Sequence, residues 1–354
     1  MQDINPKYKI NNKIISLLSE ISQKQGVIDA REISTDDYMF INSLASIDAV
    51  HYSTKLEGNR LTYKQVTTIL KKRDSKKIIK YEKDIREVIN YAKARSFLNK
   101  EKTLVKEIDK DLVLMVHSLI MDKIVVGKLK GFYRQAQNVI KDSETSEIVY
   151  MPPEAVDVPI MMSKLFSWIK ESLFNSVSPL IVSAIFHYYF VTVHPFMDGN
   201  GRCARLLTNF ILDKCDFTVS RYASIEKVHE QNKMEYYKCL NKHQSQLFYD
   251  IPDNIDLTNW LEYWLNCIKS TYEEAIERIQ GNVPHNNLDN RLRKAYSLFR
   301  KHKKIRAAEY QLLFGLGRTQ SVSDLNRLAE NGLIKKVGGG RSQTYIINES
   351  KLKE

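Results

Sequence analysis

Cysteine is scarce in this chain, and its cysteines lack any metal-binding spacing. The 354 residues include four of them, at Cys203, Cys215, Cys239 and Cys267. They form neither a paired framework nor a set of metal ligands, so we expect no disulfide and no zinc site. Such sparse thiols are typical of a reducing compartment.

Long hydrophobic runs are also missing. The opening residues MQDINPKYKI contain no apolar core of signal-peptide length, and no run approaches the roughly 20 residues of a membrane span. With 43% hydrophobic and 27% charged residues, the composition is that of a globular protein with two or three domains. We therefore expect a cytoplasmic protein with no membrane partner.

An excess of acidic residues is absent, because 54 lysines and arginines outnumber 42 aspartates and glutamates to give a net charge of +12. Residues 291–354 alone hold fifteen basic and five acidic residues. Subtracting gives a local net charge of about +10, which leaves about +2 for the rest of the chain. A basic module attached to a nearly neutral body indicates an acidic partner, with nucleic acid as the first candidate.

The densest group of reactive residues lies in residues 193–205, VHPFMDGNGRCAR. An apolar and aromatic run precedes it and opens with Ser178-Pro179, a pair suited to a helix N-cap and first turn. An apolar face at helical spacing follows it, formed by Leu206, Leu207, Phe210, Ile211 and Leu212. The stretch predicts a helix, a short loop and a second helix.

The loop suits a phosphorylated ligand. Gly199 and Gly201 allow a tight bend and close approach of a ligand, and the first amides of the second helix form an anion site. Arg202 and Arg205 are three residues apart, so both guanidinium groups lie near one face and can grip successive phosphates.

Two further side chains add chemistry to this loop. Asp198 is a hard oxygen ligand for a magnesium ion that bridges phosphates. His194 has a side chain whose ordinary pKa suits proton abstraction near neutral pH. Each has a plainer interpretation, a salt bridge to the arginines for Asp198 and a helix cap for His194. Their order within twelve residues favours a nucleotide polyphosphate site that activates a hydroxyl nucleophile.

From His194 to Arg205 the chain resembles the signature of the Fic family, His-x-Phe-x-Asp/Glu-Gly-Asn-Gly-Arg-x-x-Arg, at every fixed position. The resemblance implies a helical fold that transfers AMP from ATP to a protein hydroxyl, with Mg²⁺ and release of pyrophosphate. It assigns His194 as the base that deprotonates a target Ser, Thr or Tyr. Phe196 is then a buried anchor of the loop, and Asp198 is the metal ligand.

The same resemblance assigns the phosphate contacts. Asn200, with the amides around Gly199 and Gly201, would hold the α- and β-phosphates. Arg202 would pair with the β-phosphate and Arg205 with the γ-phosphate.

Residues 53–59, STKLEGN, resemble the inhibitory Ser/Thr-x-x-x-Glu-Gly/Asn element of Fic proteins, here N-terminal to the core as in class II. Glu57 would pair with Arg205 and displace the γ-phosphate, while Ser53 would hold the element in place. The alternative is that Glu57 is a surface residue at a helix end. Gly58 suits a helix C-cap, and Thr62 with Gln65 predicts a capping box for the next helix.

Several other segments show helical patterns. We expect a helix that ends near Gly26 and others over 36–56, 108–121, 160–173 and 260–279. The charged residues 71–103 indicate a solvated loop and a connecting helix. One helix is expected to carry Ile225, Tyr236 and Tyr237, and the two tyrosines are candidates for adenine or ribose contacts or else members of an aromatic core.

Two β-like runs around a polar turn predict a hairpin over residues 137–153. It resembles the Fic flap, whose strand edge pairs with an extended segment of the target. Its candidate docking residues are Val139, Ile140, Ile148 and Val149. The alternative is an ordinary hairpin.

Residues 281–290, rich in Gly, Asn and Pro, indicate a linker. The segment beyond it resembles a winged helix-turn-helix domain, with helices over 307–313 and 318–328 and wing strands over 333–337 and 344–347. Arg318, Thr319 and Gln320, followed by Ser321, would face a DNA major groove, and Arg341 would reach phosphate or the minor groove. The alternative is a protein-docking module.

We therefore expect a mainly α protein, with a Fic-type helical bundle, a short β-hairpin flap and a C-terminal winged-helix domain. The expected domains are residues 1–105, 106–283 and 284–354. The expected activity is AMP transfer from ATP to a target protein, restrained by Glu57. The alternatives are a DNA-binding transcriptional regulator that uses the Fic core as a nucleotide sensor, and transfer of UMP or phosphate instead of AMP. Dimers are common in the family, but no residue pattern here establishes a homodimer.

Overall fold

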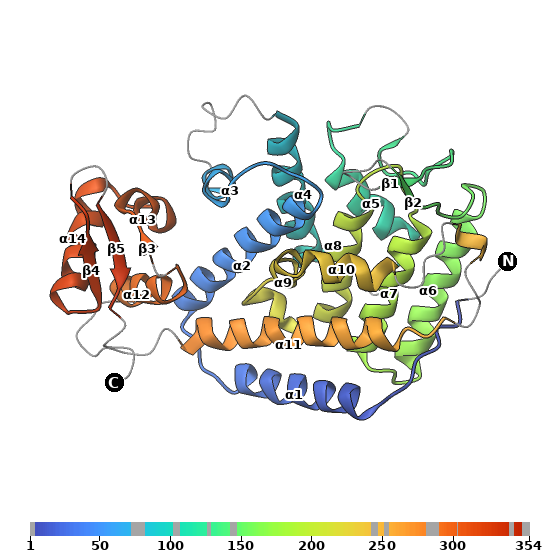
Figure 1. The fold of residues 1–354 in the computed structure, drawn as a ribbon, viewed down its shortest axis with the longest axis horizontal. Helices are drawn as coiled ribbons and strands as arrows, with labels where there is room; N and C mark the ends of the chain where they lie inside the picture. The colour runs from blue at the N-terminus through green and yellow to red at the C-terminus, as the bar shows by residue number, and fades with distance from the viewer. Residues whose placement is uncertain are drawn as a thin grey trace.

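The structure is a computed structural model that describes residues 4–71, 82–101, 107–125, 129–141, 147–241, 247–250, 255–280, 290–302, 304–339 and 343–348. Helices dominate these residues and the strands are short (Figure 1). The prediction of a mainly α protein is therefore confirmed. No helix within these ranges combines the length and the apolar character that a membrane span requires.

Four helices form the N-terminal part, α1 Asn12–Asp29, α2 Thr35–Leu56, α3 Tyr63–Leu70 and α4 Glu82–Glu101. Side chains of Asn11, Ser34 and Thr62 cap the first three, and Thr62 forms the predicted capping box with Gln65. The prediction that the first helix ends near Gly26 is wrong. The helix continues to Asp29 because Ile28 packs into the core beyond the glycine.

The central part contains a helix pair that carries the candidate site. Its elements are α5 Lys110–Ile120, β1 Ile140–Lys141, β2 Ile148–Tyr150, α6 Val158–Phe174, α7 Pro179–Val193 and α8 Asn200–Lys214. The strands β1 and β2 pair antiparallel with an irregular register. Ser178 stands at the N-cap of α7, but its side chain makes no capping hydrogen bond. Most residues of α7 and α8 are buried, so the loop between them has a rigid support.

The chain then returns over this pair through η3 Thr218–Arg221, α9 Ile225–Gln231, α10 Lys233–Asn241, η4 Phe248–Asp250 and α11 Thr258–Gln280. The single helix expected to carry Ile225, Tyr236 and Tyr237 is in fact two. The break falls at Asn232, whose side chain donates a hydrogen bond to the carbonyl of Val228 and so ends α9. The long α11 lies along α1 (Figure 1).

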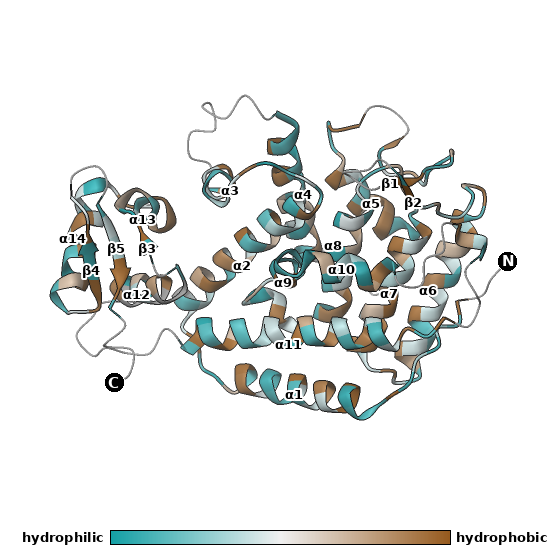
Figure 2. Cartoon of the chain, viewed as in Figure 1, coloured by the Kyte–Doolittle hydropathy of each residue, from teal (hydrophilic) through white to brown (hydrophobic). Residues whose placement is uncertain are grey.

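Two hydrophobic clusters hold these helices together. One joins α3 and α4 to α5, α6, α7 and α8, and the other joins α1 to α7, α9 and α11. In Figure 2, α1 alternates hydrophobic and hydrophilic residues along its length, as expected for a helix with one buried face. The N-terminal helices therefore share their core with the helices that carry the loop from His194 to Arg205.

The C-terminal module has its own hydrophobic cluster. Its elements are α12 Asn290–His302, β3 Lys304–Ile305, α13 Ala307–Phe314, α14 Arg318–Glu330, β4 Ile334–Val337 and β5 Thr344–Ile347. The three strands form an antiparallel sheet in the order β3, β5, β4. The predicted helix, turn, helix and strand pair are present, while α12 and β3 were not predicted. Of the linker predicted over 281–290, residues 281–289 lie outside the described residues, and α12 begins at Asn290.

The C-terminal module contacts the N-terminal helices. Phe314 at the end of α13 stacks on Phe40 of α2 at 5.4 Å between ring centroids. Lys294 of α12 lies 3.6 Å from the carboxylate of Asp37. These contacts dock the module on the first half of α2, the helix whose last residues approach the loop after α7.

Candidate active site

His194 ends α7 in the left-handed conformation, with φ 51° and ψ 60°. This conformation is strained for a residue with a Cβ atom and is common at functional sites. The imidazole Nδ1 lies 3.2 Å from the carbonyl oxygen of Val191. A carbonyl only accepts, so Nδ1 carries the proton and Nε2 is the basic nitrogen. Burial lowers the pKa of His194 to about 4, so the ring is neutral at pH 7.

Phe196 anchors the loop, as expected, and a histidine that the sequence did not single out supports it. Phe196 is fully buried, and its ring stacks on His117 of α5 at 3.7 Å with the planes 1° apart. The amide of Gly131 donates to Nδ1 of His117 at 3.0 Å. Nε2 therefore carries the proton and donates to the carbonyl of Asp198 at 3.1 Å. His117 is thus a neutral bridge from α5 to the loop.

The first turn of α8 is shaped by glycine. Gly199 is the N-cap at φ 82°, and a Cβ atom on it would lie 2.9 Å from Sδ of Met121. The side chain of Asn200, the predicted ligand of the α- and β-phosphates, bonds to the backbone of its own loop in this structure. It accepts from the amide of Phe196 at 2.9 Å and donates to the carbonyl of Phe196 at 2.8 Å, so in this structure it closes the loop.

Arg205 is almost fully buried and is held by the end of α2. Its Nε donates to Oγ of Ser53 at 2.8 Å, and its Nη2 donates to the Ser53 carbonyl at 3.0 Å and to Oε1 of Glu57 at 2.8 Å. A Cβ atom on Gly201 would lie only 2.3 Å from the same Glu57 oxygen. The Glu57 carboxylate therefore covers the first turn of α8, where the helix amides and dipole favour an anion.

Glu57 is ionised in this arrangement. Burial opposes its charge, but the nearby Arg205 and Arg202 outweigh that effect and lower the pKa of Glu57. The same pair raises the pKa of Arg205 against the effect of its burial. The ion pair that the sequence suggested between Glu57 and Arg205 is therefore present.

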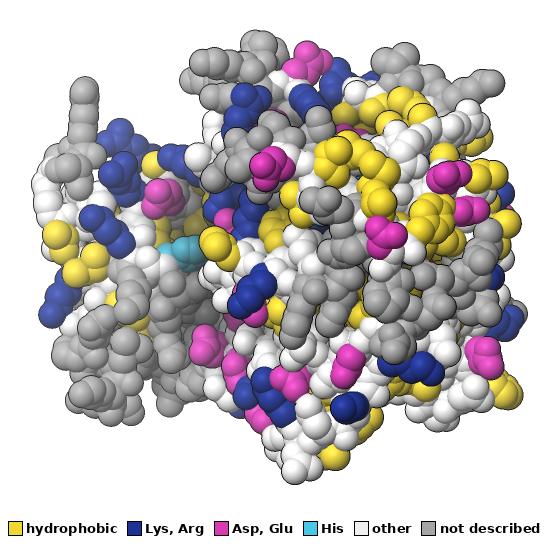
Figure 3. Space-filling model, turned by 45° about the vertical axis from the view of Figure 1, so that its right-hand side comes forward, with side chains coloured by type: hydrophobic (Ala, Val, Ile, Leu, Met, Phe, Trp, Pro, Cys, Tyr) yellow, Lys and Arg dark blue, Asp and Glu magenta, His cyan; other side chains and the backbone are white. Residues whose placement is uncertain are grey.

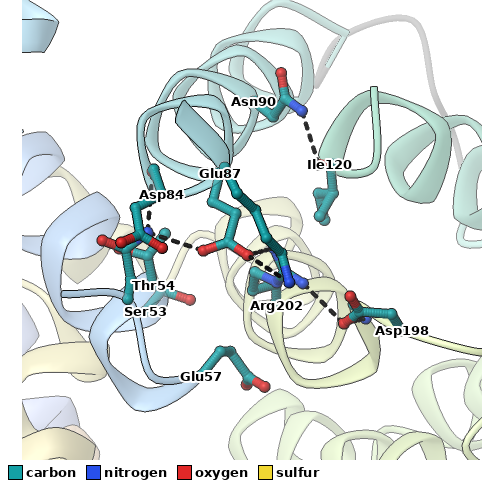
Figure 4. A network of polar contacts seen from close by, with 12 residues as sticks. Ser53, Thr54, Glu57, Asp84, Glu87, Asn90, Ile120, Asp198 and Arg202 are labelled. Carbon is teal, nitrogen blue, oxygen red and sulfur yellow. Dashed lines mark hydrogen bonds and ion pairs between the residues drawn. The ribbon is translucent and has the colours of Figure 1, made fainter. Parts of the chain in front are cut away.

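Arg202 is also buried, at 2% exposure of its side chain, and lies between two carboxylates (Figure 4). Its Nη2 donates to Oδ1 of Asp198 at 2.9 Å, and its Nη1 lies 3.5 Å from Oε1 of Glu87 on α4. Among the described residues, Nε and Nη1 of Arg202 have no hydrogen-bond partner. Arg202 therefore has two buried nitrogen donors that make no hydrogen bond in the described part of the structure.

Asp198 is more exposed than the arginines, with 44% of its side chain accessible. In the described part of the chain, no three His, Cys, Asp or Glu residues gather in a way that would hold a metal ion. Magnesium in nucleotide sites takes one or two carboxylates and completes its shell with phosphates and water. A single accessible carboxylate beside an anion site fits that type of ion.

The flap is tied to the His194 loop by Arg134, another residue that the sequence did not single out. The buried Arg134 guanidinium donates to the carbonyls of His194 at 2.9 Å and Ala136 at 3.3 Å, and to that of Pro153. Its backbone amide donates to the carbonyl of Pro195 at 2.9 Å. One side chain thus joins both arms of the flap to the loop that carries the imidazole.

The predicted hairpin is present but short, with two residues in β1 and three in β2. Val139 and Ile148 are exposed, whereas Ile140 and Val149 are half-buried. Beyond β2, Met151 forms a bridge with Leu247. The tip over 142–146 lies outside the described residues.

The comparison with protein families agrees with this geometry. Residues 107–212 match the model of the Fic/DOC family, a range that contains His117, Arg134 and the whole loop from His194 to Arg205. This part of the chain is similar to a Fic domain.

Relatives of the Fic domain include the "Protein adenylyltransferase Fic" of Drosophila grimshawi, 24% identical over 229 residues, which are 63% of this chain and 41% of that protein. The protein of the same name from Culex quinquefasciatus is 28% identical over 207 residues, 56% of this chain and 37% of that protein. The chain therefore spans about two fifths of the length of these relatives.

Solved structures show the same fold. A Fic family protein from Desulfovibrio desulfuricans superposes with a TM-score of 0.65 at 24% identity, over 97% of this chain and 98% of that one. A Fic domain containing signaling protein from Bacteroides thetaiotaomicron gives a TM-score of 0.58 at 22% identity, over 76% of this chain and 97% of that one. The expected Fic-type helical bundle is confirmed.

The two tyrosines expected near the adenine of a nucleotide bound to the Fic domain differ in position. Tyr236 lies in the core at 2% exposure, and its hydroxyl is 2.8 Å from Nε2 of His187, so it is not accessible for stacking. The aromatic-core interpretation is correct for this residue. Tyr237 is only partly buried, and its hydroxyl donates to the carbonyl of Leu56 at 3.3 Å, next to Glu57.

The candidate DNA contacts in the C-terminal module are partly accessible. Arg318, Thr319 and Gln320 are exposed at the start of α14. Ser321, expected to face a groove with them, is fully buried, and its hydroxyl donates to the carbonyl of Gly317 at 2.8 Å. Arg341 lies outside the described residues. Figure 3 shows Lys and Arg side chains on the face of this module that is turned to the viewer.

Proposed function

We propose that this protein is a protein adenylyltransferase that transfers AMP from ATP to a Ser, Thr or Tyr hydroxyl of a target protein. The main support is the neutral imidazole of His194, with Nε2 basic, at the mouth of an anion site formed by the first turn of α8. The adenylyltransferase names of the relatives agree with it.

The triphosphate of ATP would lie over the first turn of α8. The amides after Gly199 and the two unpaired donors of Arg202 would contact the α- and β-phosphates. Arg205 would hold the γ-phosphate once Glu57 has left it. Mg²⁺, held by Asp198 and phosphate oxygens, would supply charge neutralisation on the leaving pyrophosphate.

The transfer step then needs one proton acceptor. Nε2 of His194 would take the proton of the target hydroxyl as its oxygen attacks the α-phosphorus. A new oxygen–phosphorus bond forms, and the bond from the α-phosphorus to the bridging oxygen breaks. Pyrophosphate leaves with that electron pair, and AMP stays on the target.

Glu57 would restrain this activity. Its carboxylate fills the space above Gly201 and uses the guanidinium of Arg205 that would otherwise bind the γ-phosphate. Arg205 is buried, whereas 29% of the Glu57 side chain is accessible, so breaking this pair should cost an amount toward the lower end of the about 2–5 kcal/mol that is typical of desolvated pairs. About 2.7 kcal/mol holds a two-state equilibrium near 99:1. One such pair is sufficient for an inhibitory switch, and Ser53 would keep it aligned.

The flap would present the target. Val139 and Ile140, with Ile148 and Val149, would pair with an extended segment of the target through backbone hydrogen bonds. Because Met151 is already bridged to Leu247, the edge of β1 is the more open side of this hairpin. Tyr237 beside Glu57 is the remaining candidate for a nucleotide contact.

The direct test uses labelled ATP with Mg²⁺ and the purified protein. We expect weak labelling of the protein or of native-extract proteins, about 100-fold more with Glu57→Gly, and none with Glu57→Gly combined with His194→Ala. Labelling that persists without His194 would refute the assigned base. Mass spectrometry of the product separates AMP from UMP or phosphate and so decides the donor.

A second candidate function is DNA binding through residues 284–354, favoured by the local charge near +10 and by the exposed Arg318, Thr319 and Gln320. In this case the Fic domain would act as a nucleotide sensor. Salt-sensitive binding of duplex DNA that is lost on substitution of Arg318 and Arg341, without transfer that depends on His194, would support it. The division into residues 1–105, 106–283 and 284–354 remains part of the proposal.

A further inference from the structure

Glu87 on α4 lies between the two elements that would control ATP binding. Its Oε1 is 3.5 Å from Nη1 of Arg202 (Figure 4). Its Oε2 accepts a hydrogen bond from Nδ2 of Asn59 at 2.8 Å. Asn59 belongs to the turn that directly follows Glu57. One buried carboxylate therefore contacts both the proposed β-phosphate arginine and the turn that carries the proposed inhibitor.

The contact between Glu87 and Arg202 supplies charge without using up a donor. Nη1 of Arg202 has no hydrogen-bond partner among the described residues, and at 3.5 Å the Glu87 carboxylate acts as a counter-charge. A buried guanidinium needs such a counter-charge because desolvation of an unpaired ion is costly. Nε and Nη1 of Arg202 are buried and make no hydrogen bond here, so phosphate oxygens would take them as donors only once the site has opened.

The other carboxylate beside Arg202 would change partner when ATP binds. Asp198 accepts from Nη2 of Arg202 here, yet the same carboxylate is the proposed magnesium ligand. Glu87 is 7% exposed and comes from a different helix, so it would remain beside Arg202. Glu87 is therefore suited to keep Arg202 aimed at the phosphate site in both states.

Asn59 connects Glu87 to the inhibitory turn. Besides Glu87, its Nδ2 donates to the carbonyl of Asp84 at 2.9 Å, and its Oδ1 accepts from the amide of Leu61 at 3.1 Å. The side chain thus fixes the turn after Glu57 to α4. Departure of the turn would remove one hydrogen bond from the Glu87 carboxylate.

We propose that Glu87 is the positioning residue of Arg202 and that its hydrogen bond to Asn59 couples that arginine to the inhibitory turn. The inference rests on the proposed function, since it assigns a regulated partner to the β-phosphate arginine. It adds a second contact between the inhibitory turn and the phosphate site, independent of the pair between Glu57 and Arg205.

The test compares Glu87→Gln with Asp84→Asn, both in the Glu57→Gly background. Asp84 lies one turn earlier on α4, and its carboxylate pairs with Arg60, so it serves as the matched control. We expect Glu87→Gln to raise the Kd for ATP about tenfold and to leave the pH profile of transfer unchanged. Asp84→Asn should change the Kd less than twofold. An unchanged Kd in Glu87→Gln would overturn the positioning role.

A double-mutant cycle with Arg202→Met separates positioning from general stability. With methionine at this position, Glu87→Gln should have no further effect on the Kd for ATP. The same cycle in urea unfolding should give a coupling factor of at least about five in the unfolding equilibrium constant. Additive effects would overturn the inference. The unfolding cycle needs no ATP. If the protein shows no transfer activity, the proposed function is refuted, and the unfolding cycle still shows whether Glu87 and Arg202 interact.

The coupling to the inhibitory turn has its own variants. In the protein with Glu57 present, Asn59→Ala should raise transfer several-fold. Asn59→Asp, which still accepts from the Leu61 amide but repels Glu87, should raise it further. Neither variant should raise transfer in the Glu57→Gly background. A gain there, or no gain with Glu57 present, would overturn the coupling.

Discussion

The Oε1 atom of Glu57 occupies the space that a side chain on Gly201 would fill, 2.3 Å from the ideal Cβ position. The absence of a side chain on Gly201 therefore makes room for the Glu57 carboxylate in this structure. It would also allow the close approach of a phosphate. We expect Gly201→Ala to destabilise the protein by about 1–3 kcal/mol through overpacking. In the Glu57→Gly background it should be neutral or stabilising by up to about 1 kcal/mol, because alanine favours helices. Urea unfolding of the four variants measures this. An equal effect in both backgrounds would contradict the geometry.

Buried neutral histidines should make the protein sensitive to acid. Burial lowers the pKa of His117 to about 4 and of His229 to about 3, and lowers the pKa of His187 as well. As pH falls below about 6.5, the unfolded chain binds protons that the folded chain does not, so the free energy of unfolding decreases. Each of these histidines should lower the free energy of unfolding at pH 5.5 by about 1 kcal/mol relative to its value at pH 7.5. Urea unfolding at both pH values tests this. The NMR signals of these three imidazoles should remain those of the neutral ring at pH 5.5.

Arg134 should affect the rate of transfer without affecting the binding of ATP. Its side chain contacts the His194 loop and the flap rather than α8. In the Glu57→Gly background we expect Arg134→Met to lower kcat at least about tenfold, because small displacements of the base reduce rates strongly. The Kd for ATP should change less than twofold by calorimetry. A matched loss of ATP binding would mean that the substitution disturbs the whole domain.

Asp324 should stabilise the C-terminal module locally. Its fully buried carboxylate accepts from Nε of Arg291 at 2.7 Å and from the hydroxyl of Tyr310 at 3.0 Å. The Arg291 side chain is 39% exposed and keeps part of its hydration when its partner is lost, so Asp324→Ala should cost less than the about 3–5 kcal/mol of a fully buried pair. The substitution should still unfold the module at a lower temperature. Tyr310→Phe should cost only about 1 kcal/mol. Calorimetry that resolves the unfolding of this module from that of the Fic domain measures the effects of both substitutions. An unchanged unfolding temperature of the module in Asp324→Ala would contradict the prediction.

Local patterns predicted the loop from His194 to Arg205 because its chemistry lies within twelve consecutive residues. The pair between Glu57 and Arg205 spans 148 residues, and only the resemblance to a known element indicated it. His117, Arg134 and Glu87 carry no such signal. His117 meets Asp198 across 81 residues and Arg134 meets His194 across 60, so only the tertiary fold brings them together.

Two errors have physical causes that are visible in the sequence. Tyr236 and Tyr237 are adjacent, so on a helix their side chains point in different directions. When one of them lines a site, the other packs in the core behind it. The spacing of Leu292, Tyr296 and Phe299 indicates the helix α12, which the prediction omitted in favour of the charge of this segment. In both cases the helical period is more informative than the residue type.

Within the described part of the chain, every hydrogen bond that the Arg134 side chain donates ends on a main-chain oxygen, those of His194, Ala136 and Pro153. Main-chain oxygens persist when neighbouring side chains are exchanged. If a target docks on the hairpin as proposed, mutations on the outer surface of the hairpin would alter which polypeptide it accepts while the separation between that polypeptide and the imidazole stays constant. New specificity would then evolve without renewed adjustment of the catalytic distance.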